Sequence, residues 1–253
     1  MFIRTEKSIA EFIRFYPVVF TIAVINIILW IPTAIPTLSL GHFIYDNGVG
    51  HNLSVLLLHQ YWRLVTPIFL HADFAHVIFN TFALILFGPA LEKMVGKLRF
   101  ILIYLGAGII GNIGTFFMDI HSYIPHLGAS GSIYGLFGIY IYMVFFRKDL
   151  INSADSQLIK TIFVLGLVMS FIRPNINISA HVFGFIGGFA FGPIFLRKVA
   201  SIYNRPSSSS GIYKENPFQR EKAKKLFTHL DKKKIIIIIL ALLVIIGFID
   251  RFF

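Results

Sequence analysis

The chain has 253 residues, of which 56% are hydrophobic and only 14% are charged. Soluble proteins carry roughly 25% charged residues, because polar groups must cover a folded surface. The composition therefore excludes an ordinary soluble domain and a disordered chain, and it predicts a polytopic membrane protein. In such a protein the net charge of +11 is first a signal of topology rather than of nucleic-acid binding. The absence of cysteine excludes disulfides, thiolate nucleophiles and cysteine metal sites.

Seven apolar segments are candidates for membrane-spanning helices, which need about 20 mostly apolar residues. They are Pro17–Pro36, Phe74–Leu91, Phe100–Met118, Leu127–Phe146, Leu158–Ile172, Ile176–Leu196 and Ile235–Ile249. These segments divide the chain into a cytoplasmic segment (1–16), a six-span core (17–196), a basic cytoplasmic linker (197–234) and a seventh helix with an external C-terminus (235–253). The fifth and seventh segments are short and are the weakest candidates for spans. The N-terminal segment is a candidate amphipathic helix on the membrane surface.

Lys and Arg residues orient this bundle. With the N-terminus inside, 20 of the 23 basic residues lie on the cytoplasmic side, and only Arg63, Arg173 and Arg251 lie outside. The Lys214–Lys234 stretch is interpreted as a topology anchor, with an anionic-lipid patch as the alternative. No transit-like Arg/Ser-rich extension precedes the first span, which favours a bacterial plasma membrane. The segment Thr37–Asp73 is expected to fold on or into the membrane surface.

Three polar residues fall at similar depth in this topology. His76, Ser130 and His181 each lie near the outer start of a span that runs from outside to inside. A serine hydroxyl becomes a nucleophile when a neutral histidine accepts its proton. Asn80, one helical turn after His76, could join a second histidine and the Ser130 backbone N–H in stabilising an oxyanion. No Asp or Glu lies at this depth, so a Ser–His dyad is predicted rather than a carboxylate-oriented triad.

Simpler interpretations exist for the same residues. A serine in a span often serves helix packing, and a membrane histidine can be a core residue, a proton relay or a haem ligand. The spacing of Gly184, Gly188 and Gly192 predicts a packing stripe that brings the sixth span against the fourth. His71 is expected to be an exposed loop residue.

The region from Tyr61 to Gly192 resembles the rhomboid family of intramembrane serine proteases. Several family motifs occur in the family's order, and together they are far more specific than any one alone. They are Trp62-Arg63, His76-x-x-x-Asn80, Glu92 followed by Gly96 and Arg99, Gly128-Ala129-Ser130-Gly131 with Tyr134, and Ala180-His181 with Gly184 and Gly188.

The resemblance implies an all-α membrane bundle with a rhomboid-like six-helix core and one added span. It implies that Ser130 is the nucleophile and His181 the general base, and that His76, Asn80 and the Ser130 amide form the oxyanion hole. Gly128 would support the site, and Tyr134 would pack on the catalytic histidine. The implied reaction is cleavage of transmembrane segments of membrane proteins near the outer face of the bilayer. Transmembrane substrates and lipid are the expected partners, with no cofactor, metal or nucleic acid.

Two other functions remain open at this point. A non-catalytic rhomboid-like protein could bind transmembrane helices for quality control, and it would have no need of Ser130 and His181 together. A proton- or metal-coupled transporter could use His76 and His181, although the spans lack acidic residues at that depth and no internal repeat is visible.

Overall fold

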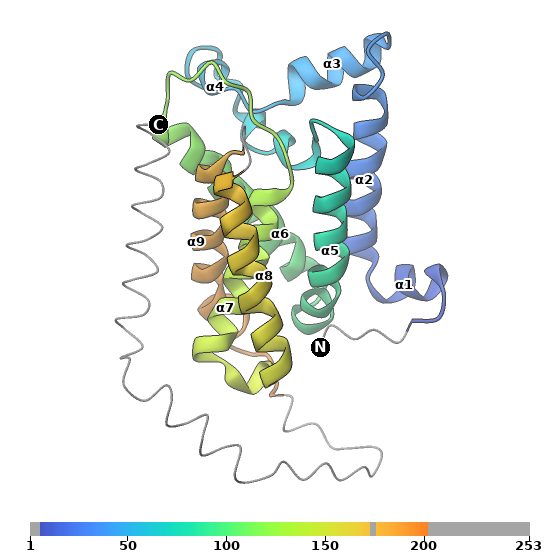
Figure 1. Ribbon diagram of the computed structural model, residues 1–253, viewed down its shortest axis with the longest axis vertical. Helices are drawn as coiled ribbons and strands as arrows, with labels where there is room; N and C mark the ends of the chain where they lie inside the picture. Colours follow the sequence, from blue (N-terminus) through green and yellow to red (C-terminus); the bar gives the residue numbers. More distant parts are fainter. Residues whose placement is uncertain (1–5, 173–175, 202–253) are drawn as a thin grey trace. The chain divides into compact units, whose positions relative to one another are not determined.

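The computed structural model describes residues 6–172 and 176–201, and within these ranges the regular structure is helical apart from one isolated bridge. The α-helices are α1 (Ile9–Phe15), α2 (Pro17–Thr33), α3 (Ser39–Gly48), α4 (Asn52–Leu58), α5 (Phe74–Val95), α6 (Lys97–Met118), α7 (Ser130–Phe146), α8 (Ser153–Ile172) and α9 (Ile178–Phe195), and Figure 1 shows their arrangement. Short 3-10 helices cover Tyr61–Leu64, Thr66–Phe69 and Lys148–Leu150. The predicted seventh span Ile235–Ile249 and the basic stretch Lys214–Lys234 lie outside the described residues.

Four of these helices, α5, α6, α8 and α9, are long and apolar enough to cross a membrane. α1 and α2 pass the same test as a pair bent by 112°, and α7 is a shorter apolar helix. The chain is therefore a multi-pass membrane protein with an all-helical bundle. Within the N-terminal segment the structure places a short helix, α1 (Ile9–Phe15).

The fifth segment is longer than the sequence pattern suggested, because α8 begins at Ser153 rather than Leu158. The backbone N–H of Asp155 donates to Asn152 Oδ1 at 2.8 Å, and Asn152 Nδ2 donates to Asp155 Oδ2 at 2.6 Å. This reciprocal pair resembles a capping box, in which two side chains satisfy the first turn of a helix. Polar residues before Leu158 therefore extend the helix instead of preceding it.

α7 is the most enclosed helix, and every residue from 131 to 141 is buried. It packs most extensively against α9, and both pack against α6. A Cβ on Gly184 or Gly188 would fall well inside 3.0 Å of the α7 backbone, at Gly131 and Gly135 respectively. The predicted packing of the sixth span on the fourth through small residues is confirmed at these two glycines, because only a missing Cβ permits this approach.

The segment between α2 and α5 is folded rather than extended, and side chains of the 3-10 region hold the end of α3. Arg63 donates from Nη1 to the Val49 carbonyl at 2.8 Å and from Nη2 to the Asp46 carbonyl at 2.7 Å. Trp62 Nε1 donates to the Asn47 carbonyl at 3.0 Å, and Thr66 Oγ1 to the Gly48 carbonyl at 2.6 Å. The last carbonyls of a helix have no partner within the helix, so these bonds explain why a buried arginine stands here.

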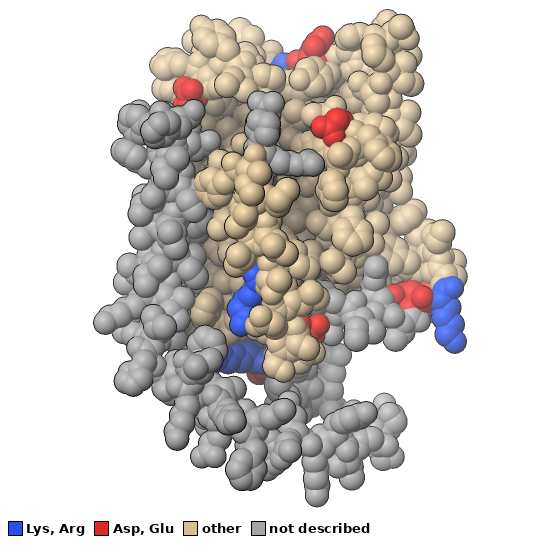
Figure 2. Space-filling view, viewed as in Figure 1, with Lys and Arg blue, Asp and Glu red and all other residues tan. Residues whose placement is uncertain are grey.

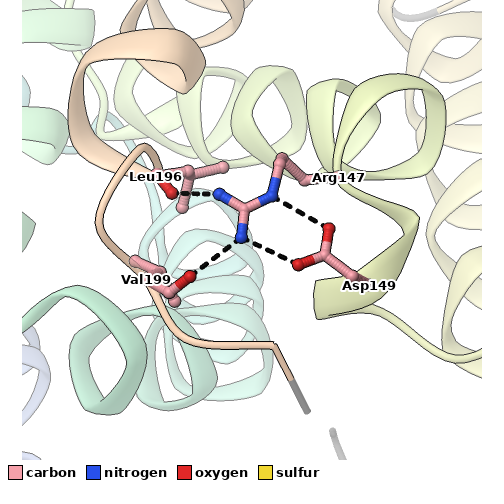
Figure 3. Close-up of polar contacts among 4 residues, drawn as sticks. All are labelled: Arg147, Asp149, Leu196 and Val199. Carbon is pink, nitrogen blue, oxygen red and sulfur yellow. Dashed lines mark hydrogen bonds and ion pairs between the residues drawn. The ribbon is translucent and has the colours of Figure 1, made fainter. Parts of the chain in front are cut away.

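Charged side chains lie toward the two ends of the described bundle on the face shown in Figure 2, and other residues cover the middle. At the end of α7 the Arg147 guanidinium binds Asp149 and the Leu196 and Val199 carbonyls (Figure 3). The Val199 bond is 2.8 Å long. This cluster fastens the C-terminal ends of α7 and α9 together, opposite the ends that carry the candidate catalytic residues.

Candidate active site

Ser130 is the first residue of α7, and the loop before it is held by backbone contacts to the 3-10 region. Gly128 has a φ of +132°, a conformation that side chains disfavour, and its N–H donates to the Pro67 carbonyl at 2.9 Å. Two residues further back, Gly50 and His126 exchange backbone hydrogen bonds of 2.8 and 2.9 Å. The helix start at Ser130, rather than at Leu127 as the apolar pattern suggested, follows from this tethered turn.

His76 and Asn80 on α5 face the turn before Ser130. A Cβ placed on Gly128 would lie 2.6 Å from His76 Nε2 and 3.7 Å from Asn80 Nδ2. Asn80 is buried, and its Nδ2 finds no hydrogen-bond partner among the described residues. A buried amide donor without a partner costs free energy, so such a group is a candidate for binding a ligand or a reaction intermediate. Gly128 is thus the residue whose missing side chain leaves room beside both donors.

His181 lies in the first turn of α9 and is buried. The Tyr134 ring stacks on it, with the ring centroids 4.2 Å apart and the planes inclined by 12°. Tyr134 is one helical turn after Ser130, so both residues lie on one face of α7. Next to them, a Cβ on Gly131 would lie 3.2 Å from the Ala180 carbonyl oxygen. The neighbours of Ser130 and of His181 are therefore in direct contact.

Ser170 on α8 belongs to this site, although the sequence analysis did not single it out. Its Oγ lies 2.9 Å from His181 Nδ1, 2.8 Å from the Tyr134 hydroxyl and 2.9 Å from the Gly166 carbonyl oxygen. Ser170 is the only polar side chain between Ile162 and Ile172. A single polar residue in an apolar stretch could have identified Ser170 from the sequence, since polar groups in spans usually face the bundle interior.

His71 corrects the expectation of an exposed loop residue, because its side chain is only 2% exposed. Its ring lies 5.1 Å from the ring of His76, and its Nε2 lies 3.5 Å from the Ala129 backbone nitrogen. Burial, with a smaller effect from His76, lowers the pKa of His71 to about 3, so it is neutral at physiological pH. The turn between the 3-10 region and α5 directs His71 inward, against Ala129. Its position outside the predicted span had suggested an exposed side chain instead.

The predicted site residues thus lie on α5, α7 and α9 and in the turn before α7, and Ser170 adds α8. The first turns of α5 and α9 carry His76 and His181, and α7 begins at Ser130. The arrangement offers a hydroxyl, a histidine that could accept its proton, and amide donors, which are the groups that acyl transfer requires.

Known proteins resemble the chain over this region. The family model of the rhomboid domain matches residues 58–198. YdcA of Bacillus subtilis (strain 168), which carries the name of a rhomboid protease, is 48% identical over 198 residues, covering 78% of this chain and 98% of YdcA.

Other relatives are less similar to the chain. The rhomboid protease GluP of Bacillus subtilis (strain 168) is 41% identical over 136 residues, which are 54% of this chain and 26% of GluP. Rhomboid-like protease 1 of Toxoplasma gondii is 28% identical over 194 residues, covering 72% of this chain and 64% of that protein. The matched domain covers more than half of the chain and contains Ser130, His181, His76 and Asn80. The chain belongs to the rhomboid family.

Proposed function

We propose that this protein is an intramembrane serine endopeptidase that cleaves transmembrane segments of membrane proteins near the outer face of the bilayer. Its relatives YdcA and GluP are named as rhomboid proteases. The observation that carries the proposal is the convergence of three elements at the start of α7. The Tyr134 ring on the helix that Ser130 begins stacks on His181. Asn80 Nδ2, which has no hydrogen-bond partner among the described residues, faces the turn before Ser130.

The proposed reaction begins when His181 Nε2 accepts the proton of the Ser130 hydroxyl as Oγ attacks a substrate carbonyl. The carbonyl oxygen gains negative charge, and donors that are already in place stabilise it without reorganisation. Asn80 Nδ2, His76 and the Ser130 backbone N–H are the proposed donors. His181 then gives the proton to the leaving amine, and water hydrolyses the acyl-enzyme by the same steps.

The substrate must expose a peptide bond that a membrane helix normally hides in hydrogen bonds. Local unwinding is therefore part of the proposed reaction, and residues with low helix propensity near the cleavage site favour it. The positive-inside distribution supports an outer position for the site, with the N-terminus in the cytoplasm of a bacterial cell.

The test uses purified protein in liposomes with a single-span substrate. Ser130→Ala and His181→Ala are each expected to abolish cleavage, and Ser130→Ala to abolish labelling by a fluorophosphonate probe. Ser132→Ala is the matched control, because Ser132 lies on the same helix but its buried Oγ has no hydrogen-bond partner among the described residues. Cleavage by Ser130→Ala at the wild-type rate would refute the proposal.

The same experiment distinguishes the non-catalytic alternative. A protein that only binds transmembrane helices would retain substrate in a pull-down but would neither cleave it nor react with the probe. The proposed peptidase is expected to cleave the substrate and to react with the probe. Its Ser130→Ala variant is expected to lose both activities and still to bind the substrate.

A further inference from the structure

We propose that Ser170 is the positioning residue of the histidine base, so that the predicted dyad is completed by a hydroxyl on α8. The inference rests on the proposed function and deepens it. Proteases with a Ser–His pair use a third group to hold the histidine ring and choose its tautomer. The described spans place a serine, and not a carboxylate, at that position.

The hydrogen-bond inventory of Ser170 carries the argument. Its hydroxyl has one proton to donate and two lone pairs to accept with, and it has three neighbours within 2.9 Å. The Gly166 carbonyl can only accept a hydrogen bond. If the Ser170 proton goes there, the remaining two contacts are satisfied when Tyr134 and His181 donate to Ser170 Oγ.

This assignment uses all three contacts and decides the tautomer of His181. A proton on Nδ1, donated to Ser170, leaves Nε2 as the unprotonated nitrogen of the neutral ring. That is the form a base needs in order to accept the Ser130 proton. The opposite tautomer would require Ser170 to donate to Nδ1 and would forgo the bond to Gly166.

The surroundings hold the three groups in place. Ser170 and His181 are 3% and 6% exposed, and the Tyr134 ring covers the face of the imidazole. In a buried setting an N–H without an acceptor is costly, so removal of the Ser170 hydroxyl penalises the tautomer that the reaction uses. His181 would then turn or exchange its proton, and the penalty falls on the chemical step.

The first measurement compares Ser170→Ala and Ser170→Thr with the wild type on a single-span substrate. Ser170→Ala is expected to lower kcat about 10- to 100-fold with KM unchanged, and Ser170→Thr to restore most of the rate because it retains the hydroxyl. Tyr134→Phe removes one donor to Ser170 but keeps the ring stack, so it should lower kcat less than Ser170→Ala. Thr161→Val is the matched control, since it removes a hydroxyl from an exposed position of the same helix.

The second measurement reads the tautomer directly in the wild-type protein. Nitrogen NMR of histidine-labelled protein distinguishes protonated from bare ring nitrogens, and His181→Asn identifies the His181 signals among the nine histidines. A proton on Nδ1 in the wild type supports the proposal, and a proton on Nε2 overturns it. Equal kcat for Ser170→Ala and wild type also overturns it. If Ser130→Ala abolishes cleavage while Ser170→Ala keeps the wild-type kcat, only this inference fails and the proposed function stands.

Discussion

At the scale of single residues, the proposed role of Asn80 in the oxyanion hole rests on the surroundings of its amide. Asn80 is 7% exposed, and its Nδ2 is unpartnered among the residues that the structure describes, while the missing side chain of Gly128 leaves space beside it. Folding usually pairs every buried donor, so an unpaired one in a prepared space indicates preorganisation for charge that develops during a reaction. The buried Arg63 guanidinium, by contrast, donates to the Val49 and Asp46 carbonyls.

Replacement of this amide provides a test at the residue scale. Asn80→Ala is expected to lower kcat by about 10²- to 10³-fold, the range found when one oxyanion donor is removed. KM should change little, because the donor acts on the charged intermediate. Thr81→Val, at the next buried position of α5, serves as the control. A loss of rate no larger than that of the control would exclude Asn80 from the oxyanion hole.

Asn80, Ser130 and His181 could be predicted as site candidates from the sequence, because polar side chains in apolar spans are rare. Their depth in the membrane follows from the order of the spans. Sequence reasoning could not place His71, and it did not predict the contacts of Glu92. His71 depends on a turn fixed by distant carbonyls. The Glu92 carboxylate accepts from the Val18 and Val19 amides at 3.1 and 2.9 Å, more than 70 residues away along the chain. Such tertiary contacts leave no periodic pattern in the sequence.

At the scale of elements, the close contact of α7 and α9 determines whether the site exists. The two helices carry Ser130 and His181, and their backbones approach through glycines at one end and through Arg147 at the other. The small-residue spacing on α9 predicted this contact. The full length of α8 was not predicted, because a capping pair of polar residues extended it beyond the apolar stretch.

A methyl group on this interface should separate the helices. The Cβ of Gly188→Ala would fall well inside 3.0 Å of the Gly135 backbone, which cannot move aside as a flexible side chain could. We expect a loss of about 1–3 kcal/mol in stability and a larger loss of cleavage activity, because the site spans both helices. The thermal midpoint in detergent, measured beside the cleavage rate, checks this.

The control for that substitution is Gly106→Ala on α6. Its Cβ would meet only the ring edge of Phe191, at 3.0 Å, and that side chain can shift. Equal midpoints for the two variants would contradict the interpretation that backbone contact, rather than added volume, limits this interface.

At the scale of the whole molecule, the apolar excess and the positive charge now have separate explanations. The apolar residues form helices long enough to cross a bilayer, and exposed large hydrophobic side chains on α5, α6 and α8 remain for contact with lipid. Of the four longest of these helices α8 is the least enclosed, with 22% of its apolar window buried against 44% to 50% for the others. The alignment proposed for His181 therefore depends on the least buried of these four helices, which a sequence pattern could not show.

The distribution of Lys and Arg predicts which side of the membrane each connection faces, and the natural absence of cysteine makes this prediction easy to test. Tyr123→Cys lies in the exposed connection between α6 and α7, on the predicted outer side, and Lys97→Cys begins α6 on the predicted inner side. In intact cells a membrane-impermeant thiol reagent is expected to label Tyr123→Cys alone, and both variants after permeabilisation. Labelling of Lys97→Cys in sealed cells would invert the topology and place the candidate site at the cytoplasmic face. Substrates would then have to be cleaved near their inner ends, so the same pair of variants also decides where along a transmembrane segment the cut is made.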